Sequence, residues 1–156
     1  MIQRVQTVYL FLAILCLGAT CTGVEFISFT QTLARFSLSV FGIEEIHGSA
    51  SEVYKSIPIY LSIIGICLFL FMTLMSYKDL ARQLRWVRRL TFLYFVLIIG
   101  AIVFYYTGGT LFFEGAFETE LGLGYALLVF GFPFCFLAQL AIKKDKKLLD
   151  SLNRLR

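Results

Sequence analysis

LTFLYFVLIIGAIVFYYTGGTLFF, residues 90–113, decides the fold class, because these 24 consecutive residues include no Asp, Glu, Lys or Arg. A helix needs about 20 apolar residues to cross ~30 Å of hydrocarbon. Three further charge-free runs, of 20, 22 and 22 residues, cover 5–24, 56–77 and 121–142. The sequence therefore predicts an all-α membrane protein, a bundle of four transmembrane helices. These helices are expected at about 5–26, 56–77, 90–112 and 121–142.

The composition of the whole chain agrees with this class. Hydrophobic residues make up 59% of the 156 residues and charged residues 15%, well below the roughly 25% of soluble domains. Mean hydropathy is +0.83. We expect a single membrane domain over 1–156, with an outer loop at 27–55 and a cytoplasmic tail at 143–156. The first run lacks a small-residue cleavage pattern, so we expect a retained helix rather than a signal peptide.

The basic residues predict the orientation. Segments 1–4, 78–89 and 143–156 hold 12 of the 14 Lys and Arg residues but only three of the 10 acidic ones. Short loops rich in Lys and Arg stay on the cytoplasmic side of a membrane. We therefore predict a multi-pass membrane protein with both termini in the cytoplasm.

The outer loop carries its own pattern. In FSLSV, residues 36–40, apolar Phe36, Leu38 and Val40 alternate with two serines. Such alternation is typical of a half-buried strand. We predict a small extracytoplasmic loop or β-hairpin between the first two helices.

Residues that carry chemistry are scarce. The predicted membrane core holds no Asp, Glu, Lys, Arg or His, whereas ion-coupled transporters use such residues there. His47 is the single histidine, and its acidic neighbours match no metal or catalytic spacing. The four cysteines fall inside predicted spans and form no C-x-x-C, which indicates packing. We predict no catalytic, cofactor-binding or metal-binding residue, and no enzyme.

Pro133 interrupts the fourth predicted span. A proline inside a helix removes one hydrogen bond and crowds the preceding turn, so a kink is expected there. Four phenylalanines surround it in FGFPFCF, residues 130–136. Ordinary packing explains them, and the alternative is an aromatic groove for a lipid or quinone.

The tail, AIKKDKKLLDSLNRLR at 141–156, is amphipathic. Leu148, Leu152 and Leu155 recur at i, i+4 and i+7, and four lysines precede them. A topology signal needs only the lysines, which also attract anionic lipid at the cytoplasmic face. The leucine stripe predicts in addition a helix that docks on a partner or on the bilayer interface. Nucleic-acid binding is not expected, because topology alone accounts for the basic cluster.

Three phrases resemble an uncharacterised family of small four-helix inner-membrane proteins of Bacteroidota, a domain of unknown function. They are MIQRVQTVYLFLA at 1–13, YKDLARQLR at 77–85 and LAIKKDKKLLDSLNRLR at 140–156. The residues that match the family pattern are Ile2, Gln3, Arg4, Gln6 and Thr7 in the first phrase, and Ala141, Ile142, Lys143, Lys144, Asp145, Leu148, Ser151, Arg154 and Arg156 in the third. Lys146, Asp79 and Ala81 depart from the family pattern. The resemblance implies an inner membrane and no known activity.

All three phrases belong to predicted cytoplasmic segments, so the recognition surface is expected there. Its proposed docking residues are Gln3, Arg4, Arg82, Arg85, Leu148, Leu152 and Leu155. The predicted function is a non-enzymatic accessory or structural subunit of an inner-membrane complex, such as an envelope or protein-export machine. Its partners would be other inner-membrane proteins. The alternative is a small transporter or lipid- or quinone-binding protein that uses a groove at Pro133.

Overall fold

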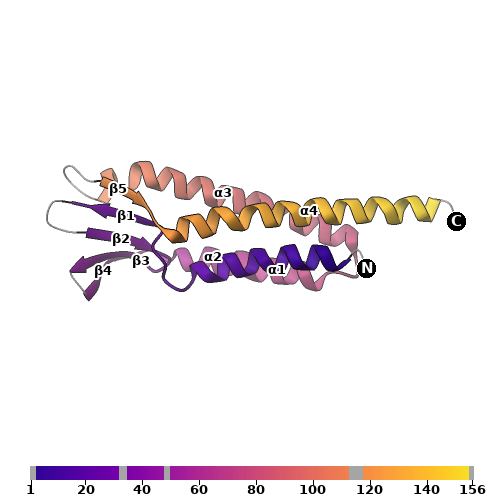
Figure 1. Ribbon diagram of the computed structural model, residues 1–156, viewed down its shortest axis with the longest axis horizontal. Helices are drawn as coiled ribbons and strands as arrows, with labels where there is room; N and C mark the ends of the chain where they lie inside the picture. Colours follow the sequence, from indigo (N-terminus) through magenta and orange to yellow (C-terminus); the bar gives the residue numbers. More distant parts are fainter. Residues whose placement is uncertain (1–2, 32–34, 48–49, 113–117, 155–156) are drawn as a thin grey trace.

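The protein is built from four helices and one antiparallel sheet. The computed structural model describes residues 3–31, 35–47, 50–112 and 118–154. The helices, which run along the long axis (Figure 1), are α1 (Gln3–Thr20), α2 (Ile59–Met75), α3 (Leu80–Phe112) and α4 (Leu123–Arg154). The strands are β1 (Ile27–Thr30), β2 (Arg35–Ser39), β3 (Gly42–His47), β4 (Ala50–Ser56) and β5 (Glu118–Leu121).

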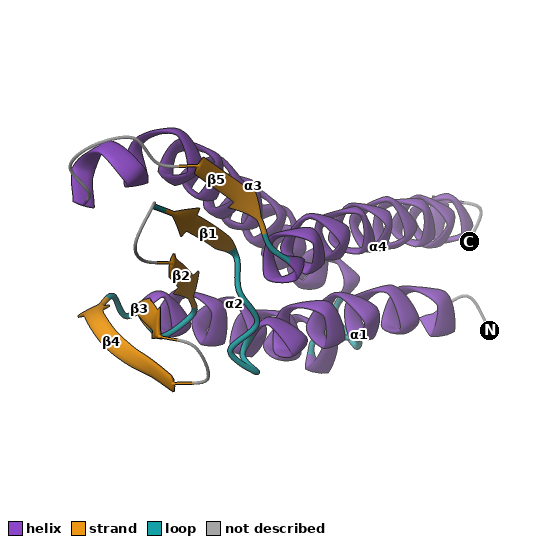
Figure 2. Cartoon of the chain, turned by 60° about the vertical axis from the view of Figure 1, so that its left-hand side comes forward, coloured by secondary structure: helices purple, strands orange, loops and turns teal. Residues whose placement is uncertain are grey.

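The sheet lies at one end of the helices, which we call the sheet end (Figure 1). At the opposite end, the tail end, α1 begins and α4 finishes. The five strands follow the order β4-β3-β2-β1-β5, and every neighbouring pair is antiparallel (Figure 2). Four consecutive strands thus form a meander, and β5 joins its edge from a distant part of the chain.

Two glycines fasten this sheet to α4. The Gly122 amide donates to the Phe26 carbonyl at 2.8 Å, and the Gly124 amide donates to the Glu25 carbonyl at 2.8 Å. A Cβ on Gly122 would overlap the Glu25 carbonyl, and one on Gly124 would come within 2.8 Å of the Val24 carbonyl. Glycine is needed at both places because two backbones approach closely there.

The helices pack around α4. The most extensive contacts are those of α1 with α4, followed by α3 with α4, whereas α2 contacts α1 and α3 more lightly. Buried leucines, isoleucines and aromatic residues fill the interior, and Tyr94 and Phe29 are the largest fully buried side chains. Large apolar side chains such as Phe92, Leu68 and Phe130 are more than half exposed on the outer faces of the helices. Exposed apolar surface of this extent indicates an apolar surrounding.

The predicted fold class, an all-α bundle of four transmembrane helices with a small outer hairpin, is wrong. The structure is mixed, with four helices and a five-stranded sheet. Two helical segments, Leu80–Gly108 and Leu123–Ser151, are long and apolar enough to cross a membrane. The other apolar helical segments, Val5–Thr20 and Ile59–Met75, are shorter.

The error has a physical reason. A run without charges shows that a segment avoids water, but it does not show that the whole segment is helical. In the first run, for which a helix over 5–26 was predicted, α1 ends at Thr20 and the chain turns at Gly23, which has φ 83°. The second run, 56–77, begins at the last residue of β4 and passes Pro58 before α2 starts. Each run therefore contains turn or strand residues in addition to a helix.

The outer segment 27–55 contains far more structure than a hairpin. It forms β1, β2, β3 and nearly all of β4. The alternation at Phe36–Val40 predicted a strand correctly, but the serines between these residues are buried as well. Ser37 and Ser39 are thus buried, although the alternation of side chains between the two faces of a strand would place these serines in water.

Candidate functional site

A buried polar contact closes the tail end. The side-chain amide of Gln6, on α1, donates a hydrogen bond to a carboxylate oxygen of Asp145, on α4. Gln6 is 3% exposed and Asp145 is 7% exposed. Burying a carboxylate is costly unless it is hydrogen-bonded. This contact therefore fixes the start of α1 against α4 at a defined register.

A second buried amide lies between α2 and α3. The Gln83 side-chain nitrogen donates to the Thr73 carbonyl at 3.2 Å, while the Thr73 hydroxyl donates to the Phe69 carbonyl at 2.8 Å. The Gln83 side-chain oxygen is buried and has no hydrogen-bond partner among the residues that the structure describes. All four helices thus bury polar side chains at this end.

The tail continues α4 without a break. Because α4 runs to Arg154, it extends nine residues beyond Asp145, about 13 Å of helix. Figure 1 shows this segment projecting past the start of α1. Leu148 is 44% exposed and Leu149 is 49% exposed on it. Leu152 lies in the helix with a side chain outside the described part, and Leu155 lies outside the described residues.

The predicted arginines stand at the start of α3. Arg82 and Arg85 are exposed. An Asp79 carboxylate oxygen accepts from the Arg82 amide at 3.0 Å, which makes Asp79 the N-cap of α3, and its other oxygen lies 3.5 Å from Arg82 Nε. The hydrogen bond from that amide holds the pKa of Asp79 below its ordinary value. Gln3 and Arg4 open α1, with side chains outside the described part.

Pro133 lies inside α4, and its side chain is exposed. On the other side of that helix, the Tyr94 hydroxyl donates to the Leu128 carbonyl at 2.9 Å. Gly131 makes room for this ring, since a Cβ there would overlap the Tyr94 hydroxyl. The Pro133 region therefore carries a tightly packed contact between α3 and α4.

Three hollows follow the line of contact between α2 and α3, which we call the α2–α3 seam. The tail-end hollow, ≈ 380 Å³, is lined by Met72, Met75, Ser76, Lys78, Asp79, Arg82 and Trp86. The middle hollow, ≈ 480 Å³, is lined by residues of both helices from Leu61 to Phe69 and from Leu90 to Leu97. Pro133 lines none of the three.

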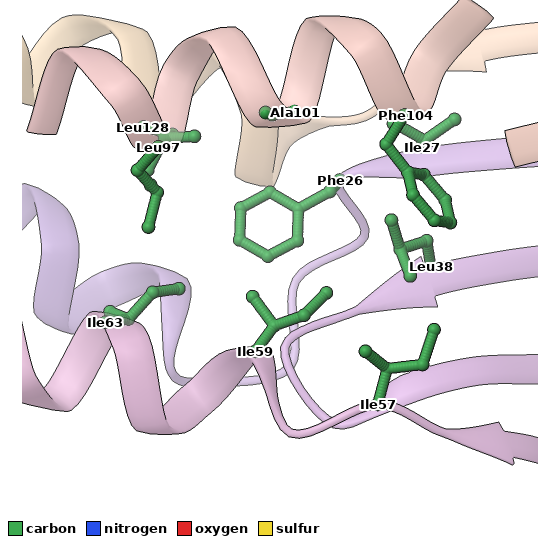
Figure 3. A pocket seen from close by; sticks show the side chains of 11 residues that line it. Phe26, Ile27, Leu38, Ile57, Ile59, Ile63, Leu97, Ala101, Phe104 and Leu128 are labelled. Carbon is green, nitrogen blue, oxygen red and sulfur yellow. The ribbon is translucent and has the colours of Figure 1, made fainter. Parts of the chain in front are cut away.

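The third, the sheet-end hollow, measures ≈ 320 Å³ and is wholly apolar. Phe26, Ile27 and Leu38 line it from the sheet side, Ile59 and Ile63 from α2, and Leu97, Ala101 and Phe104 from α3 (Figure 3). Leu128 closes it from α4. Nothing in this lining could hold a metal ion or move a proton, and the space suits a hydrocarbon chain.

Residues 2–155 match the family described as Domain of unknown function (DUF4293). The chain belongs to this family. No curated protein matches it. Membership in DUF4293 agrees with the resemblance of the three phrases to a domain of unknown function.

The structure brings two of these phrases together. Gln6 belongs to the first phrase and Asp145 to the third, and they form the hydrogen bond described above. Neither was predicted as a site residue. The signal that could have found the pair was the presence of both residues in the phrases that carry the resemblance.

Proposed function

We propose that this protein is a non-enzymatic accessory subunit of a bacterial inner-membrane complex, such as an envelope or protein-export complex of Bacteroidota. It would join its partner, another inner-membrane protein, through the projecting end of α4. One observation carries the proposal: α4 continues past the bundle as an exposed helix with Leu148 and Leu149 on its surface. An isolated helix this short is marginal in water, so it gains order by burying these leucines.

The placement in the membrane is part of the proposal. In it, α3 and α4 cross the membrane, the tail end faces the cytoplasm, and α1 and α2 pack alongside. The charges support this arrangement. Among the residues that the structure describes, 11 basic residues belong to the tail end, in segments 3–4, 78–89 and 143–154, whereas six acidic residues belong to the sheet side. Basic loops remain cytoplasmic.

The test compares purification of tagged full-length protein with that of a truncation after Lys147. The truncation keeps four lysines and removes the leucines. We expect it to insert normally and to lose a partner that co-purifies stoichiometrically with the full chain in mild detergent. Leu148→Gln/Leu149→Gln should lose the same partner. The matched control, Lys146→Gln/Lys147→Gln, should retain it, because only the leucines are proposed to be buried in the contact.

If the truncated protein assembles like the full chain, the tail is a topology signal only and the proposal fails. The alternative function is a lipid or quinone carrier, and the apolar sheet-end hollow favours it over a small transporter. A lone protein that carries stoichiometric quinone, with no partner in any preparation, would support that alternative.

A further inference from the structure

The hollows of the α2–α3 seam form a series from charged to apolar. At the tail end, Lys78 and Arg82 line the first hollow. The middle hollow begins where the Phe69 ring contacts the Trp86 ring, with the two ring centroids 4.9 Å apart. Trp86 lines the tail-end hollow and Phe69 the middle one, so this aromatic contact forms the step between them. The middle hollow is almost entirely apolar.

The seam is open because small residues line it. Ser62 and Gly65, on α2, face the middle hollow. A Cβ built on Gly65 would meet nothing within 4 Å. The rim consists of exposed apolar side chains, including Leu61 and Val96. In a membrane, this rim opens the seam toward lipid rather than toward water.

We propose that the tail-end and middle hollows together hold one anionic phospholipid, with its phosphate at Lys78 and Arg82 and one acyl chain in the middle hollow. This inference rests on the membrane placement given under Proposed function. From Arg82 to Leu97, α3 rises about 22 Å. One leaflet, half of the 40–45 Å that a bilayer spans with its headgroups, is about 20–22 Å thick. The two hollows therefore match the length of one lipid.

The charges select an anionic headgroup. Segment 78–89 contains five basic residues and a single acidic one, Asp79. Asp79 is already engaged by the backbone of α3 and by Arg82. Lys78, Arg82 and Asp79 are the charged residues that line the tail-end hollow, and together they leave one net positive charge there. The guanidinium carbon of Arg89 lies 5.8 Å from the centroid of the Trp86 ring. Tryptophan is enriched at membrane–water interfaces, so Trp86 fits the depth of a lipid headgroup.

Trp86 is the single tryptophan of the chain, so tryptophan fluorescence reports on this one position of the seam. The protein is reconstituted into phosphatidylcholine vesicles that contain a small, equal fraction of acyl-brominated phosphatidylglycerol or acyl-brominated phosphatidylcholine. Bromine quenches tryptophan on contact. We expect brominated phosphatidylglycerol to quench Trp86 as if enriched about fivefold over its bulk fraction, the order that one net positive charge provides at an anionic surface.

Two variants remove the site in different ways. Lys78→Gln/Arg82→Gln should abolish the preference for phosphatidylglycerol. The matched control, Lys143→Gln/Lys144→Gln, removes the same charge from exposed positions of α4, and the preference should remain. Gly65→Leu should fill the middle hollow and lower quenching by brominated phosphatidylglycerol to the level expected from its bulk fraction. Its control is Gly18→Leu on α1, where a Cβ also meets nothing within 4 Å.

Equal quenching by both brominated lipids would overturn the inference, since it would show unselective contact with the surrounding bilayer. A preference that survives both Lys78→Gln/Arg82→Gln and Gly65→Leu would overturn it as well. If Trp86 is not quenched even in wholly brominated vesicles, the membrane placement itself fails, and this result is distinct from the other two.

Discussion

Gln6 and Asp145 show how two residues far apart in the sequence set the register of the tail end. Removing one partner of a buried hydrogen bond leaves the other without compensation, at a cost of about 1–3 kcal/mol. We therefore expect Gln6→Ala to lower the free energy of unfolding by about that amount. Thermal unfolding of the purified protein in detergent measures the loss. Asp145→Asn keeps an acceptor oxygen and should cost less.

The double variant gives the sharper result. Gln6→Leu/Asp145→Leu replaces both polar partners with apolar side chains, and it should be more stable than either single leucine variant. If the two single effects simply add, the two side chains are not coupled, and the contact does not hold the helices together.

Gly131 and Tyr94 offer a second coupled pair. A Cβ at Gly131 would overlap the Tyr94 hydroxyl and would lie 3.2 Å from the Cβ of Cys16. Overpacking of this kind costs about 1–3 kcal/mol, so Gly131→Ala should lower the unfolding temperature. Tyr94→Phe removes the oxygen, and with it the hydrogen bond to Leu128. In the double variant, the loss should be clearly smaller than the sum of the two single losses. Strict additivity would show that Gly131 does not serve to seat the Tyr94 ring.

At the scale of elements, the start of α3 depends on its cap. The lowered pKa of Asp79, caused by the hydrogen bond from the Arg82 amide, means that its ionised form is favoured in the folded protein. The stability it contributes is therefore complete above the ordinary value of 3.8 and is lost as the pH falls through the lowered folded value.

Asp79→Ala should be less stable than the wild type near neutral pH, and this difference should shrink at about pH 2.5. Asp79→Asn keeps a capping oxygen and should lie between the two. Unfolding temperatures at both pH values provide the measurement. A difference between wild type and Asp79→Ala that is the same at both would refute an ionised cap.

The elements also show where sequence patterns are reliable. The charge-free runs 90–113 and 121–142 largely coincide with parts of α3 and α4, because length and hydropathy act within one segment. Strand β5 was missed because it pairs with β1, and the partners Ile27 and Leu121 are far apart in the chain. Nothing local at Glu118–Leu121 predicts a strand that is completed by a distant neighbour.

The candidate site divides in the same way. The exposure of Leu148 was predictable from a stripe within one helix. The contact of Gln6 with Asp145 and the hollows of the seam depend on which helices become neighbours. A single sequence does not encode that choice in any local pattern, although the phrases typical of the family contain both polar partners.

For the whole molecule, the separation of charge follows the long axis. The sheet lies at one end and the projecting part of α4 at the other (Figure 1). The apolar outer surfaces of α3 and α4 lie between them. In the membrane placement proposed above, the helices between the two ends would contact lipid, and the proposed partner contact lies at the tail end, where α4 projects.

Labelling of single cysteines tests this placement most directly. In a variant with its four native cysteines replaced by alanine, Thr30→Cys places an exposed thiol on β1 and Ser151→Cys places one on the tail. A membrane-impermeant maleimide is added to intact spheroplasts and, separately, to permeabilised ones. We predict that Thr30→Cys reacts in both, and that Ser151→Cys reacts only after permeabilisation. Equal labelling of both positions in intact spheroplasts, or labelling of neither before permeabilisation, would contradict a protein that spans the membrane with its sheet outside and its tail inside.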